Sequence, residues 1–136
     1  LLDGRTVHVE GLENGFFVGP TVFDNVTPDM AIATEEIFGP VACLMRADTL
    51  SEAIDMANRS AYGNSSSLYS NDGREAREFV HRIRAGMLGI NVGVPAPMAY
   101  FPFGGQKASL FGDTKVHGTA AIDFYTERKS VITRWF

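Results

Sequence analysis

The stretch SSSLYSNDGREAREFVHRIRAGMLGINV, residues 65–92, carries the pattern that decides the fold. Its middle predicts a helix over residues 73–84. Asp72 and Glu75 have the spacing of a capping box, which marks the start of this helix. One apolar face at helical spacing supports this helix: Ala76, Phe79, Val80 and Ile83. Residues 65–69 and 87–92, on either side, are the predicted strands.

The same alternation of strand and helix continues upstream. Residues 41–45 are a short apolar run, which predicts a buried strand. Residues 49–60 predict a helix, because Thr49 and Glu52 have capping-box spacing and Gly63 follows as a C-cap. Helices between short apolar strands favour right-handed βαβ units. The sequence therefore predicts an α/β fold with a mostly parallel sheet and flanking helices.

The remaining segments predict shorter elements. Residues 6–10 alternate polar and apolar side chains, which indicates a half-buried strand. Residues 15–23 contain Gly19-Pro20, so a strand there is interrupted or lies at an edge. A short helix is expected just after Pro28, and residues 95–105 predict an irregular loop that faces a ligand.

Length and charge exclude several classes of protein. A chain of 136 residues makes one domain at most, and folding at that length buries roughly two-thirds of the unfolded surface. Twelve basic and sixteen acidic residues give a net charge of −4 without a basic stripe, so nucleic acid is not an expected partner. Apolar runs all fall well short of the roughly 20 residues of a membrane span. The start at Leu1, without methionine or signal pattern, predicts the interior of a longer protein.

The reactive side chains do not form a complete active site. Cys43 is the one cysteine, which excludes an internal disulfide, and its apolar neighbours favour a structural thiol. The three histidines lack metal-ligand spacing, and residues 103–107 match neither phosphate-binding glycine motif. Glu35 and Glu36 would point about 100° apart on a helix, so they are not a facing acid–base pair. Two interpretations remain for them: solvated or helix-ending carboxylates, or a carboxylate that accepts hydrogen bonds from ligand hydroxyls.

Four motifs, in order, resemble the aldehyde dehydrogenase superfamily. They are GFFVGPTVF (residues 15–23), EEIFGP (35–40), PFGGQK (102–107) and the FYT…K run (124–129). Further segments are similar to its CoA-acylating methylmalonate-semialdehyde dehydrogenases: GINV (89–92), PAPM (95–98), SLFGD (109–113) and TRW (133–135). One departure is Gly93, which stands where those enzymes have a proline.

The resemblance implies specific site residues. Glu36 matches the residue that hydrogen-bonds the nicotinamide ribose of NAD, and Phe38 matches the aromatic beside the nicotinamide. Phe103 matches an aromatic of the aldehyde pocket. The family's catalytic cysteine, glycine-rich cofactor turn and substrate-carboxylate ligands lie upstream of EEIFGP, so Cys43 is not the nucleophile. The resemblance therefore implies a C-terminal part with no catalytic residue, inactive in isolation, and the histidine and cysteine pattern predicts no metal site.

The resemblance also implies an organisation and partners. Residues 1–126 would be part of the catalytic domain, and residues 127–136 an oligomerisation strand. The apolar, β-branched run Ser130–Phe136 would pair with another subunit. The complete enzyme would be cytoplasmic, would bind a small semialdehyde and NAD, and would transfer the acyl group to coenzyme A. Two alternatives remain: an aldehyde dehydrogenase whose acyl acceptor is water, and a catalytically dead self-associating module.

Overall fold

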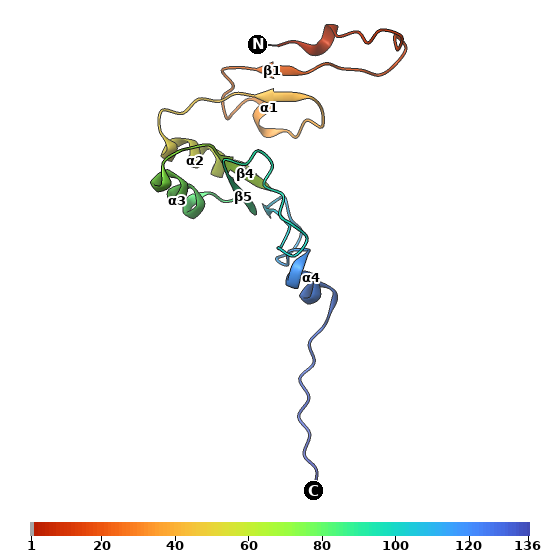
Figure 1. Ribbon diagram of the computed structural model, residues 1–136, viewed down its shortest axis with the longest axis vertical. Helices are drawn as coiled ribbons and strands as arrows, with labels where there is room; N and C mark the ends of the chain where they lie inside the picture. Colours follow the sequence, from red (N-terminus) through yellow and green to blue (C-terminus); the bar gives the residue numbers. More distant parts are fainter. Residues whose placement is uncertain (1) are drawn as a thin grey trace. The chain divides into compact units, whose positions relative to one another are not determined.

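The predicted βαβ unit is present in the computed structural model, which describes residues 2–136 (Figure 1). Strand β4 (Ser65–Leu68) and strand β5 (Met87–Ile90) pair in parallel, with Ser65 opposite Met87. Helix α3 (Gly73–Arg82) connects the two strands. Because the connection is a helix between parallel neighbours, the central prediction from residues 65–92 is confirmed.

The start of α3 shows why this segment is a helix. The Asp72 side chain accepts a hydrogen bond from the Arg74 amide at 2.6 Å, as expected for an N-cap. Glu75 does not reach back to the Asp72 amide. Instead the Ser70 hydroxyl accepts from the Asp72 amide at 3.0 Å and donates to the Glu75 carboxylate at 2.5 Å. Ser70 therefore bridges the Asp72 amide and the Glu75 carboxylate, which bond directly in a standard capping box.

The end of α3 lies two residues before the predicted one. Asn58 supplies the reason: its side-chain amide donates to the Arg82 carbonyl at 2.9 Å and accepts from the Arg84 amide at 2.7 Å. These bonds satisfy backbone groups released at the helix end, while Ile83 takes an extended conformation. The chain thus turns toward β5 without a C-cap glycine.

The described residues fall into two units, residues 2–56 and residues 57–136. In chain order, the other elements are η1 (Gly4–Thr6), β1 (Thr21–Phe23), α1 (Ala31–Thr34), β2 (Val41–Cys43), α2 (Leu50–Arg59), β3 (Tyr62–Gly63), β6 (Gln106–Lys107) and α4 (Gly118–Tyr125). Strands β1 and β2 pair in parallel, and β3 and β6 pair antiparallel. Two of the three strand pairs are thus parallel, as the predicted α/β fold requires.

Some predicted elements agree with the structure. Helix α2 begins as expected, with the Glu52 amide donating to Thr49 Oγ1 at 3.2 Å. Glu52 reaches back one residue further than predicted, to the Asp48 amide at 2.9 Å. Of residues 15–23, only β1 after Pro20 is a strand, as the interruption at Gly19-Pro20 predicts.

Three predictions about local structure are wrong. Residues 6–10 are not a strand: η1 ends at Thr6, where Asp3 caps its first turn and Gly4 packs directly against Gly19, and residues 7–10 follow as loop and turn. Gly63 is not a C-cap, since it lies in β3 and its amide donates to Ser109 Oγ at 3.1 Å. The predicted buried strand at residues 41–45 is shorter and only half-buried.

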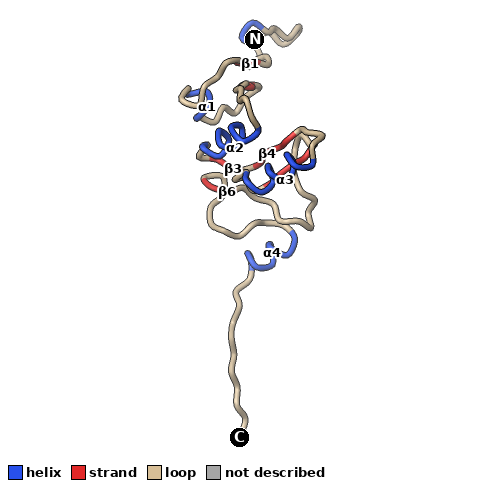
Figure 2. The backbone as a smooth tube through the Cα atoms, turned by 90° about the vertical axis from the view of Figure 1, so that its left-hand side faces the viewer, coloured by secondary structure: helices blue, strands red, loops and turns tan. Residues whose placement is uncertain are grey.

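The predicted strand Ser130–Phe136 is also not formed. Figure 2 shows the segment after α4 as loop, and its apolar side chains are exposed. Ile132 is fully exposed, and Trp135 is 90% exposed. A β-strand needs a hydrogen-bonded neighbour, and residues 2–136 supply none to this segment.

The chain buries less surface than its size predicts. Its accessible area is 11034 Å², whereas a globule of 14.8 kDa would expose about 7,000 Å² and two globules of half that mass about 8,400 Å² in total. About half of the unfolded surface is buried, so the expectation of two-thirds is wrong. Much apolar surface is therefore exposed.

Candidate active site

The loop between α1 and β2 holds Glu36 and Phe38. Helix α1 ends at Thr34, and the Glu35 amide closes its last turn by donating to the Ala31 carbonyl at 2.8 Å. Beyond Phe38, β2 begins and is anchored by its pairing with β1. Both ends of the loop are thus fixed by secondary structure. The helix-ending interpretation applies to Glu35, because Glu36 lies outside the helix.

Glu36 and Phe38 are open to a ligand. Within residues 2–136, neither a hydrogen bond nor an ion pair engages the exposed Glu36 carboxylate. Phe38 is fully exposed, so both faces of its ring are accessible. A free carboxylate accepts hydrogen bonds from paired hydroxyls, and a free aromatic face packs on a planar ring. Both side chains are therefore available to a ligand that carries paired hydroxyls and a planar ring.

Ile37, between these two residues, lies at an apolar cavity of 620 Å³. The cavity wall is formed mainly by aliphatic and aromatic side chains from β1, β2, α1 and the segments before them: Leu2, Val18, Val22, Phe23, Ile32, Ile37 and Val41. Asp3, Arg5 and Thr21 supply its polar part. The loop is thus placed beside a cavity that other apolar groups can fill.

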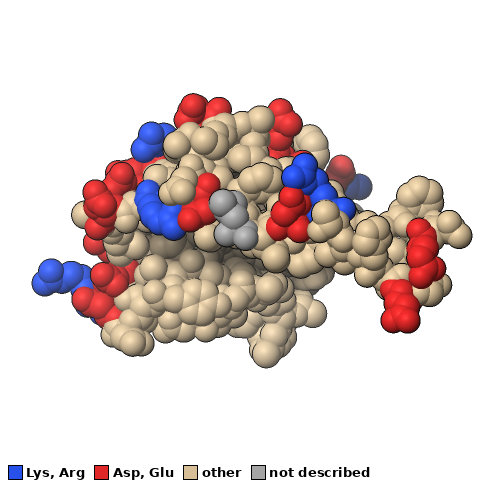
Figure 3. All heavy atoms as spheres, turned by 90° about the horizontal axis from the view of Figure 1, so that it is seen from above, with Lys and Arg blue, Asp and Glu red and all other residues tan. Residues whose placement is uncertain are grey.

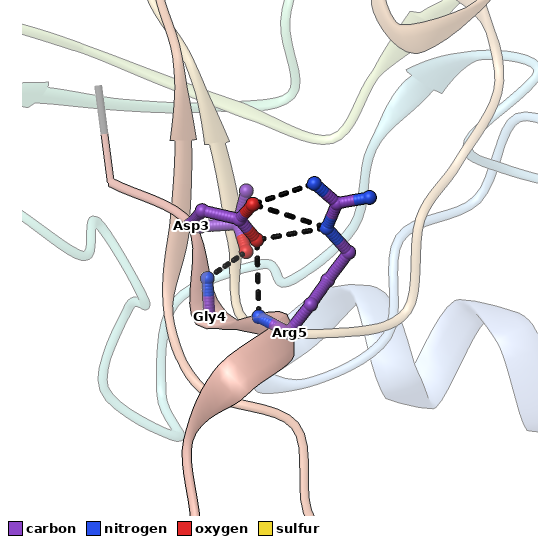
Figure 4. A network of polar contacts seen from close by, with 4 residues as sticks. Asp3, Gly4 and Arg5 are labelled. Atoms are coloured by element: carbon purple, nitrogen blue, oxygen red, sulfur yellow. Dashed lines mark hydrogen bonds and ion pairs between the residues drawn. The ribbon is translucent and has the colours of Figure 1, made fainter.

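Asp3 and Arg5, at this cavity, form a bidentate ion pair (Figure 4). The guanidinium lies 2.6 Å from the Asp3 carboxylate, which also accepts the Arg5 amide at 3.1 Å. These hydrogen bonds lower the pKa of Asp3 to about 2. Both side chains are largely exposed, so the pair is a surface feature and not an acid–base catalyst.

A second surface pair joins Asp24 and Arg46, and it lowers the pKa of Asp24 to about 2. On the face drawn in Figure 3, acidic and basic side chains are interspersed. Among residues 2–136, His, Cys, Asp and Glu do not gather into a cluster that could hold a metal ion. Helices long and apolar enough to cross a membrane are likewise absent from these residues.

Cys43 lies in β2 and is half-buried. Its thiol is 3.7 Å from the Ile32 carbonyl oxygen, to which it donates a weak hydrogen bond. The described hydrogen bonds and ion pairs give this thiol no basic partner. The structure therefore agrees with a structural role for Cys43, although the residue is less buried than its apolar neighbours predict.

Phe103 belongs to the second unit, on the predicted irregular loop. Its backbone forms a two-bond bridge with Val116: the Phe103 amide donates at 2.6 Å and its carbonyl accepts at 3.0 Å. Its half-buried ring lies 5.4 Å from the His117 ring. His117 has a positive φ of 76° and precedes α4, a position that its sequence context did not indicate.

Two lysines near the turn that follows Phe103 donate to different backbone carbonyls. Lys115 Nζ donates to the carbonyls of Gly104 and Gly105. Lys107 Nζ donates to the Ser60 carbonyl at 2.7 Å and to the Asn58 carbonyl at 3.4 Å. Burial lowers the pKa of Lys107, and the Arg84 charge lowers it further. Lys107 belongs to the PFGGQK motif, whereas Lys115 lies outside every recognised motif and was missed.

The sequence profile of the aldehyde dehydrogenase family matches residues 1–131. The chain therefore belongs to the aldehyde dehydrogenase family. The malonate-semialdehyde dehydrogenase of Pseudomonas aeruginosa is 49% identical over 135 residues, which cover 99% of this chain and 27% of that protein. That of Halalkalibacterium halodurans is 50% identical over 133 residues, covering 98% and 27% respectively. The chain thus spans about a quarter of the length of these relatives.

Solved structures agree with the family and its fold. The methylmalonate-semialdehyde dehydrogenase of Oceanimonas doudoroffii superposes with a TM-score of 0.94 at 48% identity, over 99% of this chain and 28% of that one. The Mycobacterium tuberculosis aldehyde dehydrogenase complexed with NAD+ gives a TM-score of 0.81 at 40% identity, over 93% and 26%. The α/β fold and the family predicted from the four motifs are thereby confirmed.

Proposed function

We propose that this chain is the C-terminal part of an NAD-dependent, CoA-acylating malonate- or methylmalonate-semialdehyde dehydrogenase. We refer to the complete enzyme as the parent protein. The observation that carries the proposal is identity of 49% and 50% across nearly the whole chain to proteins of that name. A TM-score of 0.94 to a methylmalonate-semialdehyde dehydrogenase supports it. A cytoplasmic location of the parent protein is part of the proposal.

Glu36 and Phe38 would hold the nicotinamide end of NAD. The unpartnered Glu36 carboxylate accepts hydrogen bonds from the ribose hydroxyls, and Phe38 packs beside the nicotinamide ring. NAD, when bound, accepts the hydride from the substrate carbon. Both residues lie on one short loop with anchored ends, so they orient the ring as well as bind it.

Phe103 would form an aromatic wall of the aldehyde pocket. Its backbone bridge to Val116 and its contact with His117 fix where the ring lies. Beside it, residues 86–90, 92, 95–97 and 102 line a second cavity of 350 Å³. An apolar wall of this kind excludes water while the acyl group passes to coenzyme A.

The test is product analysis with the parent protein. Malonate semialdehyde, NAD and coenzyme A should yield NADH and acyl-CoA in equal amounts, and omission of coenzyme A should suppress turnover. The free acid as the only product would favour the alternative in which water accepts the acyl group. The 136-residue chain alone should show no NADH formation, because its side chains do not form a complete catalytic site.

Self-association is the second part of the proposal. The exposed apolar side chains of the C-terminal segment favour residues 127–136 as an oligomerisation strand beside the catalytic part in residues 1–126. Ser130–Phe136 would pair with the sheet of another subunit. A catalytically dead self-associating module would show this association without turnover by the parent protein, which separates the two possibilities.

A further inference from the structure

The Gly104 and Gly105 carbonyls share one charged donor. Both glycines are buried, and Lys115 Nζ donates to the Gly104 carbonyl at 2.9 Å and also to the Gly105 carbonyl. Lys115 itself is half-buried. Buried carbonyls without a donor are costly, and a charged donor makes the stronger hydrogen bonds. The Lys115 ammonium therefore fixes two consecutive peptide units.

Backbone also packs closely against this turn. A Cβ atom on Gly86 would lie 2.0 Å from the Gly104 carbonyl oxygen and 2.7 Å from Gly105. The turn thus packs directly on Gly86, just before β5. Because Gly86 packs against the two glycines and Lys115 hydrogen-bonds their carbonyls, the glycines have little freedom to shift.

The same short segment also fixes Phe103. Val116 makes both hydrogen bonds of the backbone bridge to Phe103, and His117 contacts its ring. Lys115 holds the two residues that follow Phe103 in sequence. Three consecutive residues, 115–117, therefore determine the position of Phe103 from outside its own motif.

We propose that Lys115 is a positioning residue for Phe103. Its hydrogen bonds to the Gly104 and Gly105 carbonyls, here called the Lys115 clamp, set where the Phe103 ring meets the aldehyde. The inference rests on the proposed placement of Phe103 in the aldehyde pocket. Lys115 touches neither aldehyde nor cofactor in this role. Because small displacements in a pocket change rates strongly, loss of the clamp should alter aldehyde use more than NAD use.

The experiment compares Lys115→Met and Lys115→Arg with the wild-type parent protein. Methionine keeps an unbranched side chain but cannot donate, whereas arginine can donate to both carbonyls. The matched control is Lys107→Met, which removes a lysine from the other end of the same turn, where its partners are Asn58 and Ser60. Kinetics are measured with malonate and methylmalonate semialdehyde, at varied aldehyde and at varied NAD.

For Lys115→Met we expect the aldehyde KM to rise about tenfold, equivalent to 1.4 kcal/mol. The preference between the two semialdehydes should change, and the NAD KM should stay within about twofold. Lys115→Arg should recover most of the loss. Lys107→Met should leave the aldehyde preference unchanged even if it lowers the melting temperature. Equal effects of Lys115→Met on both aldehydes and on NAD would show a merely structural role and overturn the inference.

Amide hydrogen exchange supplies a readout without turnover. Exchange at Phe103 and Val116 should be about tenfold faster in Lys115→Met and unchanged in Lys107→Met, equivalent to 1.4 kcal/mol of lost protection. Unchanged exchange in Lys115→Met would also overturn the inference. Wild-type parent protein that does not oxidise either semialdehyde would instead refute the proposed function, and exchange would still decide whether Lys115 positions Phe103.

Discussion

The βαβ unit of residues 65–90 and the segment of residues 126–136 are both rich in β-prone apolar side chains, yet only the first is folded. In the first, Phe79 is 4% exposed and β4 and β5 satisfy each other's backbone groups. In the second, Ile132 is fully exposed and no strand forms. The difference shows that an apolar, β-prone pattern does not form a strand by itself, because a strand also needs a hydrogen-bonded neighbour.

The largest expected effect comes from a substitution that destabilises the folded βαβ unit. Phe79→Ala removes a buried aromatic from α3, and it should lower the free energy of unfolding of the parent protein by about 3–5 kcal/mol. The control is Val80→Ala on the same helix, at a residue that is 51% exposed, where a change within about 0.5 kcal/mol is expected. Urea denaturation measures both, and equal losses would contradict the assigned burial.

Glu36→Gln tests a residue whose exposure we attribute to cofactor binding and not to a missing packing partner. The substitution keeps the shape but removes the charge, and a hydrogen bond to a charged group contributes about 1.5–3 kcal/mol. We expect turnover or NAD affinity of the parent protein to fall tenfold or more, with aldehyde affinity and the melting temperature little changed. Steady-state kinetics at limiting and saturating NAD check this. Unchanged kinetics would show that Glu36 is only a solvated carboxylate.

The smallest expected effect concerns the exposed pair of Asp3 and Arg5. Because the pKa of Asp3 is lowered from 3.8 to about 2, its stabilisation is present above pH 3.8 and is lost as the pH falls toward 2. Arg5→Gln should return the pKa of Asp3 toward 3.8, with little change in stability at neutral pH. An NMR titration of the Asp3 carboxyl carbon measures the shift, and an unchanged midpoint would exclude the pair in solution.

The sequence predicts structure well where the determinants are local. The capped helices α2 and α3 and the parallel pair β4–β5 follow from spacing within about 25 residues. Distant contacts account for the failures: Gly4 packs on Gly19, and Gly63 pairs through β6. The same holds for the site, since the motifs indicate Glu36, Phe38 and Phe103, but not Lys115 and His117, which support Phe103 from outside its motif.

The most direct test of the comparison is light scattering on the parent protein, intact and ended at Lys129. If Ser130–Phe136 is a strand whose partner is another subunit, the intact protein should be at least a dimer at about 1 μM, where an interface worth more than roughly 8 kcal/mol holds. The shortened protein should have at most half that mass. Its βαβ unit should keep the same unfolding midpoint, which shows that the truncation does not unfold it. An unchanged mass after removal of residues 130–136 would contradict the account.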